Sequence, residues 1–218
     1  MNGYTGTYDG QPHGATGTAL GVAGADLAGL LNLGASFTNA PGGTANWSFR
    51  DPAGNYLEAS GSVAITLAKA DATIAVTPYT VTYDGNAHAS TGTAKGVNGE
   101  SLAGLNLAGT AHTHAGTFTD TWTFTDVTGN YAAVTGTVTN TIGKATATIA
   151  VTPYNAVYDG SARTATGTAK GVKGETLAGL NLAGTTHTDA GSYNDTWTFA
   201  DPTGNYFSNA GTITDVIT

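Results

Sequence analysis

Cysteine is absent from the 218-residue sequence, and basic residues are few: seven lysines and arginines stand against fifteen aspartates and glutamates. Without cysteine, the chain can form neither disulfides nor thiolate zinc sites. A formal net charge of −8 leaves no basic surface to neutralise phosphates, so we expect no nucleic-acid partner. No apolar run approaches the ~18 residues of a membrane-spanning helix, and we expect no membrane segment in this chain.

Charged residues of either sign make up only 10% of the chain, whereas glycine alone contributes 32 residues. A glycine-rich composition is often typical of disorder. Here, however, the glycines recur at fixed positions between regularly spaced aromatic residues. We therefore interpret them as turn residues of a folded chain.

The chain repeats itself every 75 residues without insertion or deletion. Three motifs show the period: Tyr-Asp-Gly early in each copy, one tryptophan later on, and Gly-Asn-Tyr after the tryptophan. They lie at Tyr8, Tyr83 and Tyr158, at Trp47, Trp122 and Trp197, and at Tyr56, Tyr131 and Tyr206. The sequence thus predicts three modules, namely repeat 1 (1–69), repeat 2 (70–144) and repeat 3 (145–218).

Repeat 1 lacks most of the first segment of the other two repeats. Repeats 2 and 3 open with Ala-Thr-Ile-Ala-Val-Thr-Pro at 72–78 and 147–153. In repeat 1, the residue equivalent to Tyr79 is already Tyr4. We therefore expect the first strand of repeat 1 to be missing, which leaves an open sheet edge that could pair with another chain.

Alternation of apolar residues with threonine predicts β-strands throughout the chain. Between Thr117 and Phe124, for example, one face carries Phe118, Trp122 and Phe124, and the other carries four threonines. Such a pattern is typical of a half-buried strand. Turn signals separate segments of this kind, so the sequence predicts an all-β fold.

Within the all-β class we predict a tandem array of three small Ig-like β-sandwich modules. The segment Asp189-Ala-Gly-Ser-Tyr193, which leads into the Trp197 strand, is similar to the tyrosine corner of Ig-like sandwiches. The alternative is a β-grasp-like module, in which a sheet packs on the segment that contains Leu102 and Leu105.

The order of motifs from Tyr158 to Tyr206 resembles YDG/MBG-type repeats: Tyr-Asp-Gly, then Thr-Ala-Thr-Gly-Thr-Ala, then Asp-Thr-Trp-Thr-Phe and Thr-Gly-Asn-Tyr. Such repeats occur in tandem in large bacterial surface, adhesin-like and haemagglutinin-like proteins. The resemblance covers nearly the whole chain. It implies an extracellular stalk or spacer on the bacterial cell surface, with neighbouring repeats or copies of the chain as partners. It implies no catalytic residues.

Candidate metal ligands are few. His112 and His114 lie two residues apart and could hold a divalent ion, with Asp126 as a further candidate. Asp126 and its equivalents Asp51 and Asp201 could also contribute to Ca²⁺ sites. The alternative interpretations are solvated loop histidines and aspartates that bind their own turn backbone. We expect no resident cofactor.

Tyr56, Tyr131 and Tyr206 follow the Gly-Asn turns at a spacing of one repeat. Exposed, they could form a row that stacks on glycans of a cell surface. Buried, they would plug the end of each module and form hydrogen bonds through their hydroxyls.

No constellation of nucleophile, base and oxyanion donors occurs, and we expect no enzyme activity. The leading hypothesis is a stalk or spacer, in which three sandwiches in line would make a rod of roughly 100 Å. One alternative is a binding module for glycans or a host surface. Another is a filament subunit that assembles through the open edge of repeat 1.

Overall fold

The computed structural model describes all 218 residues, and nearly all of its regular structure is β. It has no α-helix, only four 3₁₀ turns at Val22–Gly24 (η1), Ala28–Leu30 (η2), Ala108–Thr110 (η3) and Ala183–Thr185 (η4). None of its helices is long and apolar enough to cross a membrane. The predicted all-β fold is confirmed, whereas the Ig-like assignment stays a prediction.

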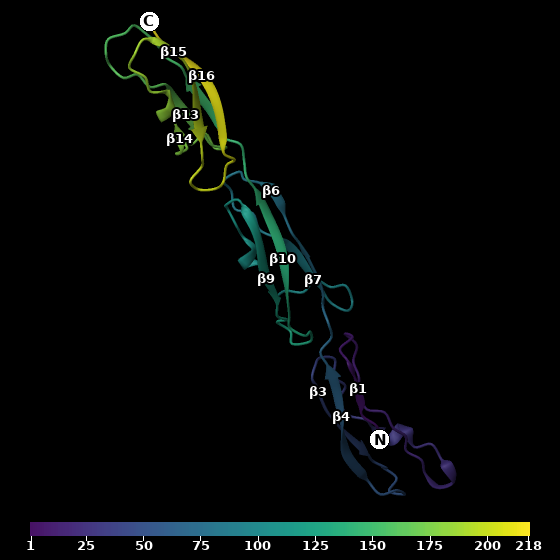
Figure 1. The fold of residues 1–218 in the computed structure, drawn as a ribbon. Coiled ribbons are helices and arrows are strands. Elements are labelled where there is room, and N and C mark those ends of the chain that lie inside the picture. Colours follow the sequence, from purple (N-terminus) through teal and green to yellow (C-terminus); the bar gives the residue numbers. More distant parts are fainter. The chain divides into compact units, whose positions relative to one another are not determined.

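Sixteen strands follow one another in three similar series (Figure 1). Repeat 1 contains β1 (Tyr4–Thr7), β2 (Leu31–Asn32), β3 (Gly42–Phe49) and β4 (Ala59–Ala68). Repeat 2 contains β5 (Thr73–Thr77), β6 (Thr80–Thr82), β7 (Thr91–Lys95), β8 (Leu105–Asn106), β9 (Gly116–Phe124) and β10 (Val134–Gly143). Repeat 3 contains β11 (Thr148–Thr152), β12 (Asn155–Ala156), β13 (Thr166–Lys170), β14 (Leu180–Asn181), β15 (Gly191–Phe199) and β16 (Asn209–Ile217).

The strands belong to two compact units, which do not coincide with the three repeats. The first unit comprises Met1–Val76, Thr91–Leu107 and Trp122–Gly136. The second comprises Thr77–Ser90, Ala108–Thr121 and Thr137–Thr218. The division passes through repeat 2, so each unit holds one whole terminal repeat together with the part of repeat 2 that contacts it.

Each repeat has a four-stranded sheet in which only the first pair of strands is parallel. In repeat 3 the order is β12-β16-β15-β14, with β12 parallel to β16 and the other pairs antiparallel. A second sheet consists of β11 and β13, antiparallel, with Ile149 opposite Ala169. The chain changes sheets at Pro153, where the ring removes a backbone donor and ends the pairing of β11. The segment around Leu102 and Leu105, on which the β-grasp alternative depended, forms no helix and contributes β8 instead.

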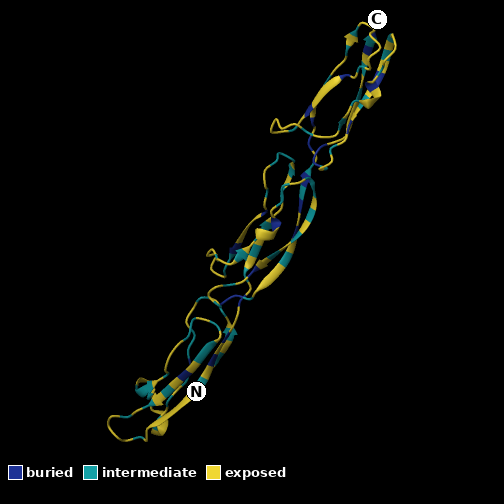
Figure 2. Ribbon diagram, turned by 90° about the vertical axis from the view of Figure 1, so that its left-hand side faces the viewer, coloured by how far each residue is buried: buried dark blue, intermediate teal, exposed yellow.

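Residues along the long strands alternate between buried and exposed, as the threonine pattern predicts (Figure 2). Trp197 lies opposite Gly211 in the β15–β16 ladder. A Cβ atom on Gly211 would lie 2.5 Å from the indole ring, so only glycine leaves room for the tryptophan there. The same close approach recurs in the other repeats at Gly61 and Gly136.

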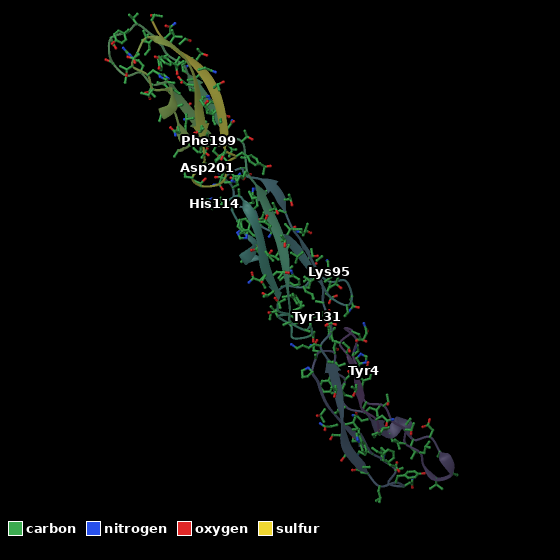
Figure 3. All side chains as sticks on the ribbon, viewed as in Figure 1. Tyr4, Lys95, His114, Tyr131, Phe199 and Asp201 are labelled. Atoms are coloured by element: carbon green, nitrogen blue, oxygen red, sulfur yellow. The ribbon has the colours of Figure 1, made fainter.

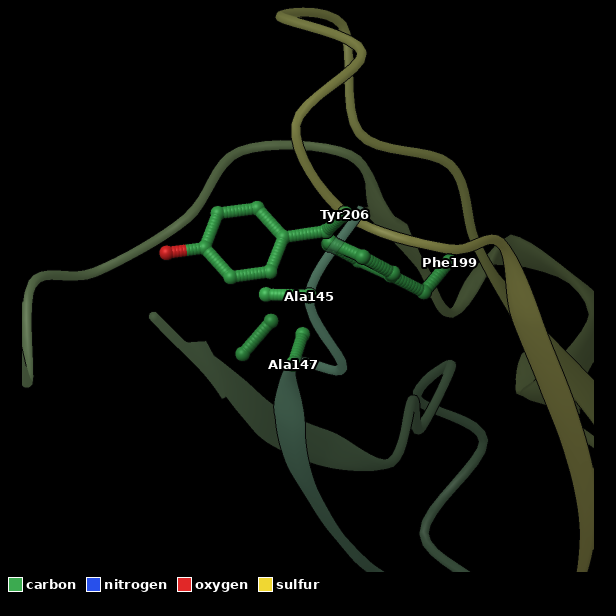
Figure 4. Close-up of a cluster of buried hydrophobic side chains, with 5 residues drawn as sticks. Ala145, Ala147, Phe199 and Tyr206 are labelled. Carbon is green, nitrogen blue, oxygen red and sulfur yellow. The ribbon is translucent and has the colours of Figure 1, made fainter. Parts of the chain in front are cut away.

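The core of repeat 3 joins its two sheets. Ala147 lies beside the two-stranded sheet and Ala169 lies within it. Both pack with Phe199 of β15 and with Tyr206 (Figure 4). Phe199 and its counterpart Phe124 in repeat 2 are each 1% exposed. Repeat 1 has no two-stranded sheet, and its counterpart Phe49 is only half-buried.

The uncovered edge of repeat 1 is the segment Thr16–Leu20, which corresponds to β7 and β13 but forms no strand. Asn2 pairs with Thr16, and their backbone hydrogen bonds are 2.8 and 2.9 Å long. Beyond this bridge no strand lies opposite Thr18 and Ala19, where repeat 3 places Ala150 and Ile149. Leu20 at the end of the segment is 68% exposed.

Candidate functional site at the joints between repeats

The motifs that recur every 75 residues meet where one repeat follows another. The Asp-x-x-Gly-Asn-Tyr turn of repeat 2 is built around the carboxylate of Asp126. Its Oδ2 accepts hydrogen bonds from the backbone N–H groups of Asn130 (2.7 Å) and Tyr131 (2.9 Å), and its Oδ1 accepts one from Thr128 (3.0 Å). Gly129 supplies the positive φ, 85°, that the turn requires.

Burial alone would raise the pKa of Asp126, but the hydrogen bonds from Thr128, Tyr131 and Asn130 outweigh it and lower the pKa. The same balance lowers the pKa of Asp201 in repeat 3. Both carboxylates therefore serve their own turns, which is the structural alternative to the proposed Ca²⁺ ligands.

The asparagine of each turn reaches across to the preceding repeat. Asn130 is 5% exposed; its Oδ1 accepts the N–H of Ala40 (3.0 Å), and its Nδ2 donates to Asn39 Oδ1 (3.1 Å). These two bonds join repeat 2 to the corner that precedes β3 in repeat 1.

The second joint has the same construction with a different partner. Asn205 Oδ1 accepts the N–H of Ala115 (2.9 Å), and Asn205 Nδ2 donates to His114 Nδ1 (3.2 Å). His114 and Asp201, the residue that shapes the turn of Asn205, lie on the two sides of this joint (Figure 3). His114, a candidate metal ligand from sequence, is thus a residue of the joint.

The tyrosine after each of these asparagines is buried rather than displayed. Tyr131 is 2% exposed and makes an edge-to-face contact with Tyr8 of repeat 1, with ring centroids 5.4 Å apart. Its hydroxyl accepts the N–H of Val97 (3.0 Å) and donates to the carboxylate of Glu100. Burial, and then the adjacent Glu100, raises the pKa of Tyr131 to about 12.

Tyr206 repeats this arrangement against Tyr83, again at 5.4 Å. Its hydroxyl accepts from Val172 (2.9 Å) and donates to Glu175 (2.7 Å). Because Tyr206 and Tyr131 are both 2% exposed, a sugar cannot stack on either ring. This corrects the expectation of a three-membered glycan-binding row, since only Tyr56 keeps part of its ring exposed.

Two polar side chains add further bonds around the tyrosines. Asn98 donates to the carbonyl of Asp9 (3.3 Å) in the first joint. At the equivalent position in the second joint, Lys173 donates to the carbonyl of Gly85 (2.5 Å) and to Asn86 Oδ1 (3.1 Å). Both joints thus bring the Tyr-Asp-Gly segment of one repeat against the Gly-Asn-Tyr end of the next.

His112 takes part in an interaction within repeat 2, separate from that of His114. Its Nε2 lies 2.9 and 3.0 Å from the two carboxylate oxygens of Asp120, and its ring stacks on Phe118 at 3.7 Å. No group of three or more histidine, aspartate or glutamate side chains gathers in a way that could hold a metal ion. The structure therefore does not bring His112, His114 and Asp126 together as one site.

Sequence reasoning missed the partners of Asp120. Asn140, which is fully buried, donates from Nδ2 to Asp120 Oδ2 (2.9 Å) and accepts from Ser90 Oγ (2.8 Å). The signal was available, because the 75-residue alignment places Asn140 opposite Asp215 in repeat 3 and Ile65 in repeat 1.

Of the comparisons with known proteins, only that with solved structures gives matches. No family model and no curated protein matches the chain. Five solved chains match, among them the surface layer protein SbsC, domains 4–9. This match has 13% sequence identity and a TM-score of 0.27; it covers all of this chain and 46% of the other. The chain thus spans about half the length of that neighbour.

Proposed function

We propose that this chain is a structural segment of an extracellular bacterial surface protein, in which the repeats serve as a stalk or spacer and carry out no catalysis. One observation carries the proposal. The Asn-Tyr pair that recurs in every repeat contacts the preceding repeat in both repeat 2 and repeat 3. The resemblance to YDG/MBG-type surface repeats supports the same role.

The joints support a mechanical role because each is held by groups that are buried and satisfied. Asn130 and Asn205 each use both ends of the amide, and Tyr131 and Tyr206 use both lone pair and proton of the hydroxyl. A joint of this kind costs energy to bend, because bending would break these hydrogen bonds and leave buried donors and acceptors without a partner.

The test is to remove the joint asparagines and measure the shape of the protein in solution. We expect small-angle scattering of the natural protein to give a maximum dimension on the order of 100 Å, as for sandwiches in line. The double variant Asn130→Ala and Asn205→Ala should keep its circular dichroism spectrum but give a broader distribution of distances. A compact globule, in either protein, would refute the stalk.

Asn55 provides a matched control for this experiment. It occupies the same turn in repeat 1, is exposed, and lies at no joint within the chain. Asn55→Ala should therefore leave the scattering curve unchanged. A change equal to that of the joint variants would show that the turn itself, and not the joint, sets the shape.

A second candidate is suggested by the uncovered edge of repeat 1 at Thr18, since the carbonyl of the next residue, Ala19, already accepts the N–H of Leu27 (2.9 Å). Unpaired strand groups of this kind can accept a strand from another chain. Assembly by this edge would make sedimentation depend on concentration, and Thr18→Pro, which removes an edge donor, would abolish the dependence. Sedimentation as a single species at all concentrations would exclude it.

A further inference from the structure

The three repeats place three different side chains at one equivalent buried position. In repeat 1 it is Ile65, 1% exposed, which packs with Ala15 and Ala45. In repeats 2 and 3 it is Asn140 and Asp215, both 0% exposed. The same interior site is therefore apolar in the first repeat, a neutral amide in the second and a carboxyl group in the third.

The amide of repeat 2 satisfies its surroundings. Asn140 Nδ2 donates to Asp120 Oδ2 at 2.9 Å, while Oδ1 accepts from Ser90 Oγ (2.8 Å) and from the N–H of Tyr79 (3.2 Å). Asp120 also contacts His112 Nε2. Asp120 thus has a donor on both sides, and one of them is the amide N–H.

Repeat 3 keeps this arrangement but loses two of its donors. Asp215 Oδ1 accepts the N–H of Tyr154 at 2.8 Å, as the amide oxygen does in repeat 2. An alanine, Ala165, replaces Ser90, and Asp215 Oδ2 replaces the donating Nδ2. As a carboxylate, Oδ2 is buried with no hydrogen-bond partner, although Asp195 is its neighbour.

The groups that face Asp215 come from three elements. Asp195 on β15 is 8% exposed, and both of its oxygens lie 2.9–3.0 Å from His187 Nε2. His187, in the segment before β15, stacks on Tyr193 at 3.6 Å. Tyr154, between β11 and β12, donates its hydroxyl to a backbone carbonyl, that of Thr185. One imidazole therefore faces two carboxyl groups, and neither tyrosine hydroxyl donates to them.

Two adjacent buried carboxylates repel each other and lose their hydration, so the second charge is expensive. A single proton between them removes one charge and supplies the missing donor. We propose that Asp195 and Asp215 form a proton-binding site in folded repeat 3, which makes the folding of this repeat, unlike that of repeat 2, depend on uptake of one proton.

The direction of the pH dependence follows from Asp215. Burial is the largest cause that raises its pKa; Asp195 adds to it, and the Tyr154 N–H and His187 oppose it. A pKa raised in the folded state means that the stabilisation is complete below the unfolded value. It is then lost as the pH rises through the folded value.

The central experiment compares the natural protein with Asp215→Asn, which installs the amide already present in repeat 2. Urea unfolding is followed by Trp197 fluorescence, with Trp47 and Trp122 replaced by phenylalanine in both proteins, between pH 4.5 and 8.5. Relative to the variant, the unfolding constant of the natural repeat 3 should rise by up to about tenfold per pH unit between the unfolded and the folded pKa of the pair, and should level off above the folded value. The two proteins should converge at the acidic end.

The mirror substitution, Asn140→Asp, is the matched control in repeat 2. Unfolding of repeat 2, followed by Trp122 fluorescence, should acquire the same pH dependence as repeat 3. Because His112 and His187 have equivalent positions, titration of the histidine contributes equally to the two repeats and cancels in the comparison. An infrared band of a protonated carboxylic acid that disappears as the pH rises through the folded pKa of the pair, and that is absent from Asp215→Asn, would report the proton directly even if a variant folds poorly.

Parallel stability curves for the natural protein and Asp215→Asn over the whole pH range would overturn the proposal. So would absence of the carboxylic acid band. Stabilisation of repeat 3 by added Zn²⁺ at constant pH, reversed by a chelator, would overturn it in another way, since the ligand of the pair would then be a metal ion.

Discussion

The contribution of the first strand of a repeat to stability can be measured at a phenylalanine that this strand covers. Phe199 in repeat 3 is 1% exposed and packs with Ala147, Ala169 and Tyr206, whereas the equivalent Phe49 in repeat 1 is half-buried. Replacing each by alanine removes the same atoms from two versions of one site, with and without the two-stranded sheet.

The expected losses differ because the surroundings differ. The buried neighbours of Phe199 are three alanines and Tyr206, and an alanine side chain is too short to fill the space that the ring would leave. A large-to-small substitution at such a site costs about 3–5 kcal/mol. Phe49 already contacts water, so Phe49→Ala loses only part of the transfer free energy, about 1–2 kcal/mol.

The measurement is urea unfolding of the full chain, followed by circular dichroism and by the tryptophan of the affected repeat. Phe199→Leu and Phe49→Leu serve as milder controls and should keep the same order. Equal losses at the two positions would refute the reasoning, because they would mean that the first strand adds nothing to the burial of this ring.

Three further predictions follow from other contacts. Gly211→Ala should destabilise the protein by about 1–3 kcal/mol in urea unfolding, because the new Cβ meets the Trp197 ring. Gly54→Ala cannot serve as the control, because the positive φ of Gly54 would itself strain an alanine. Adding Ala-Thr-Ile-Ala before Met1 should raise the stability of repeat 1 by about 1.5–3 kcal/mol through burial of the isoleucine; no change in the urea midpoint would count against it. The pKa of Glu175 is lowered, and the hydrogen bond from the hydroxyl of Tyr206 is the largest cause. The resulting stabilisation is present above the unfolded pKa and lost on acidification, so Glu175→Gln should flatten the acid limb of the melting temperature.

Periodicity in the sequence was enough to predict the long strands, because the residues at every second position of β9 and β15, all of them polar, are exposed without exception. The order of the strands in each sheet could not be reached in the same way, because it depends on which distant segments pair, and local patterns do not encode that.

The site was harder to predict than the fold. Tyr131 and Tyr206 stood out by their spacing, but whether they are exposed depends on the neighbouring repeat, which covers them with Tyr8 and Tyr83. His114 was paired with His112 because the two are close in sequence. In a strand-rich chain, residues that are neighbours in sequence can belong to different contacts, and here the partner of His114 is Asn205, 91 residues away.

What changes between the repeats is as informative as what stays. Residues at a joint must fit two repeats at once, so a single substitution there leaves a partner unpaired on the other side, at a cost of about 1–3 kcal/mol. The interior pair of His112 and Asp120 contacts only its own repeat, and in repeat 1 both are replaced together, by Phe37 and Ala45. When both residues are replaced together, no intermediate arises in which one buried polar group has lost its partner.

Repeat 3 shows what happens when only part of such a group changes. Asp215 stands where Asn140 would donate, while Asp195 and His187 are retained. An apolar replacement of all three would have removed every buried charge, as in repeat 1. Retaining the carboxylate next to a second carboxyl group instead makes a proton the least costly partner. If that site bound no proton, exchange of aspartate for asparagine would change the stability by the same amount at every pH. The growth of the difference between the two proteins as the pH rises from the acidic end is therefore the measurement that separates a proton-dependent repeat from a merely imperfect one.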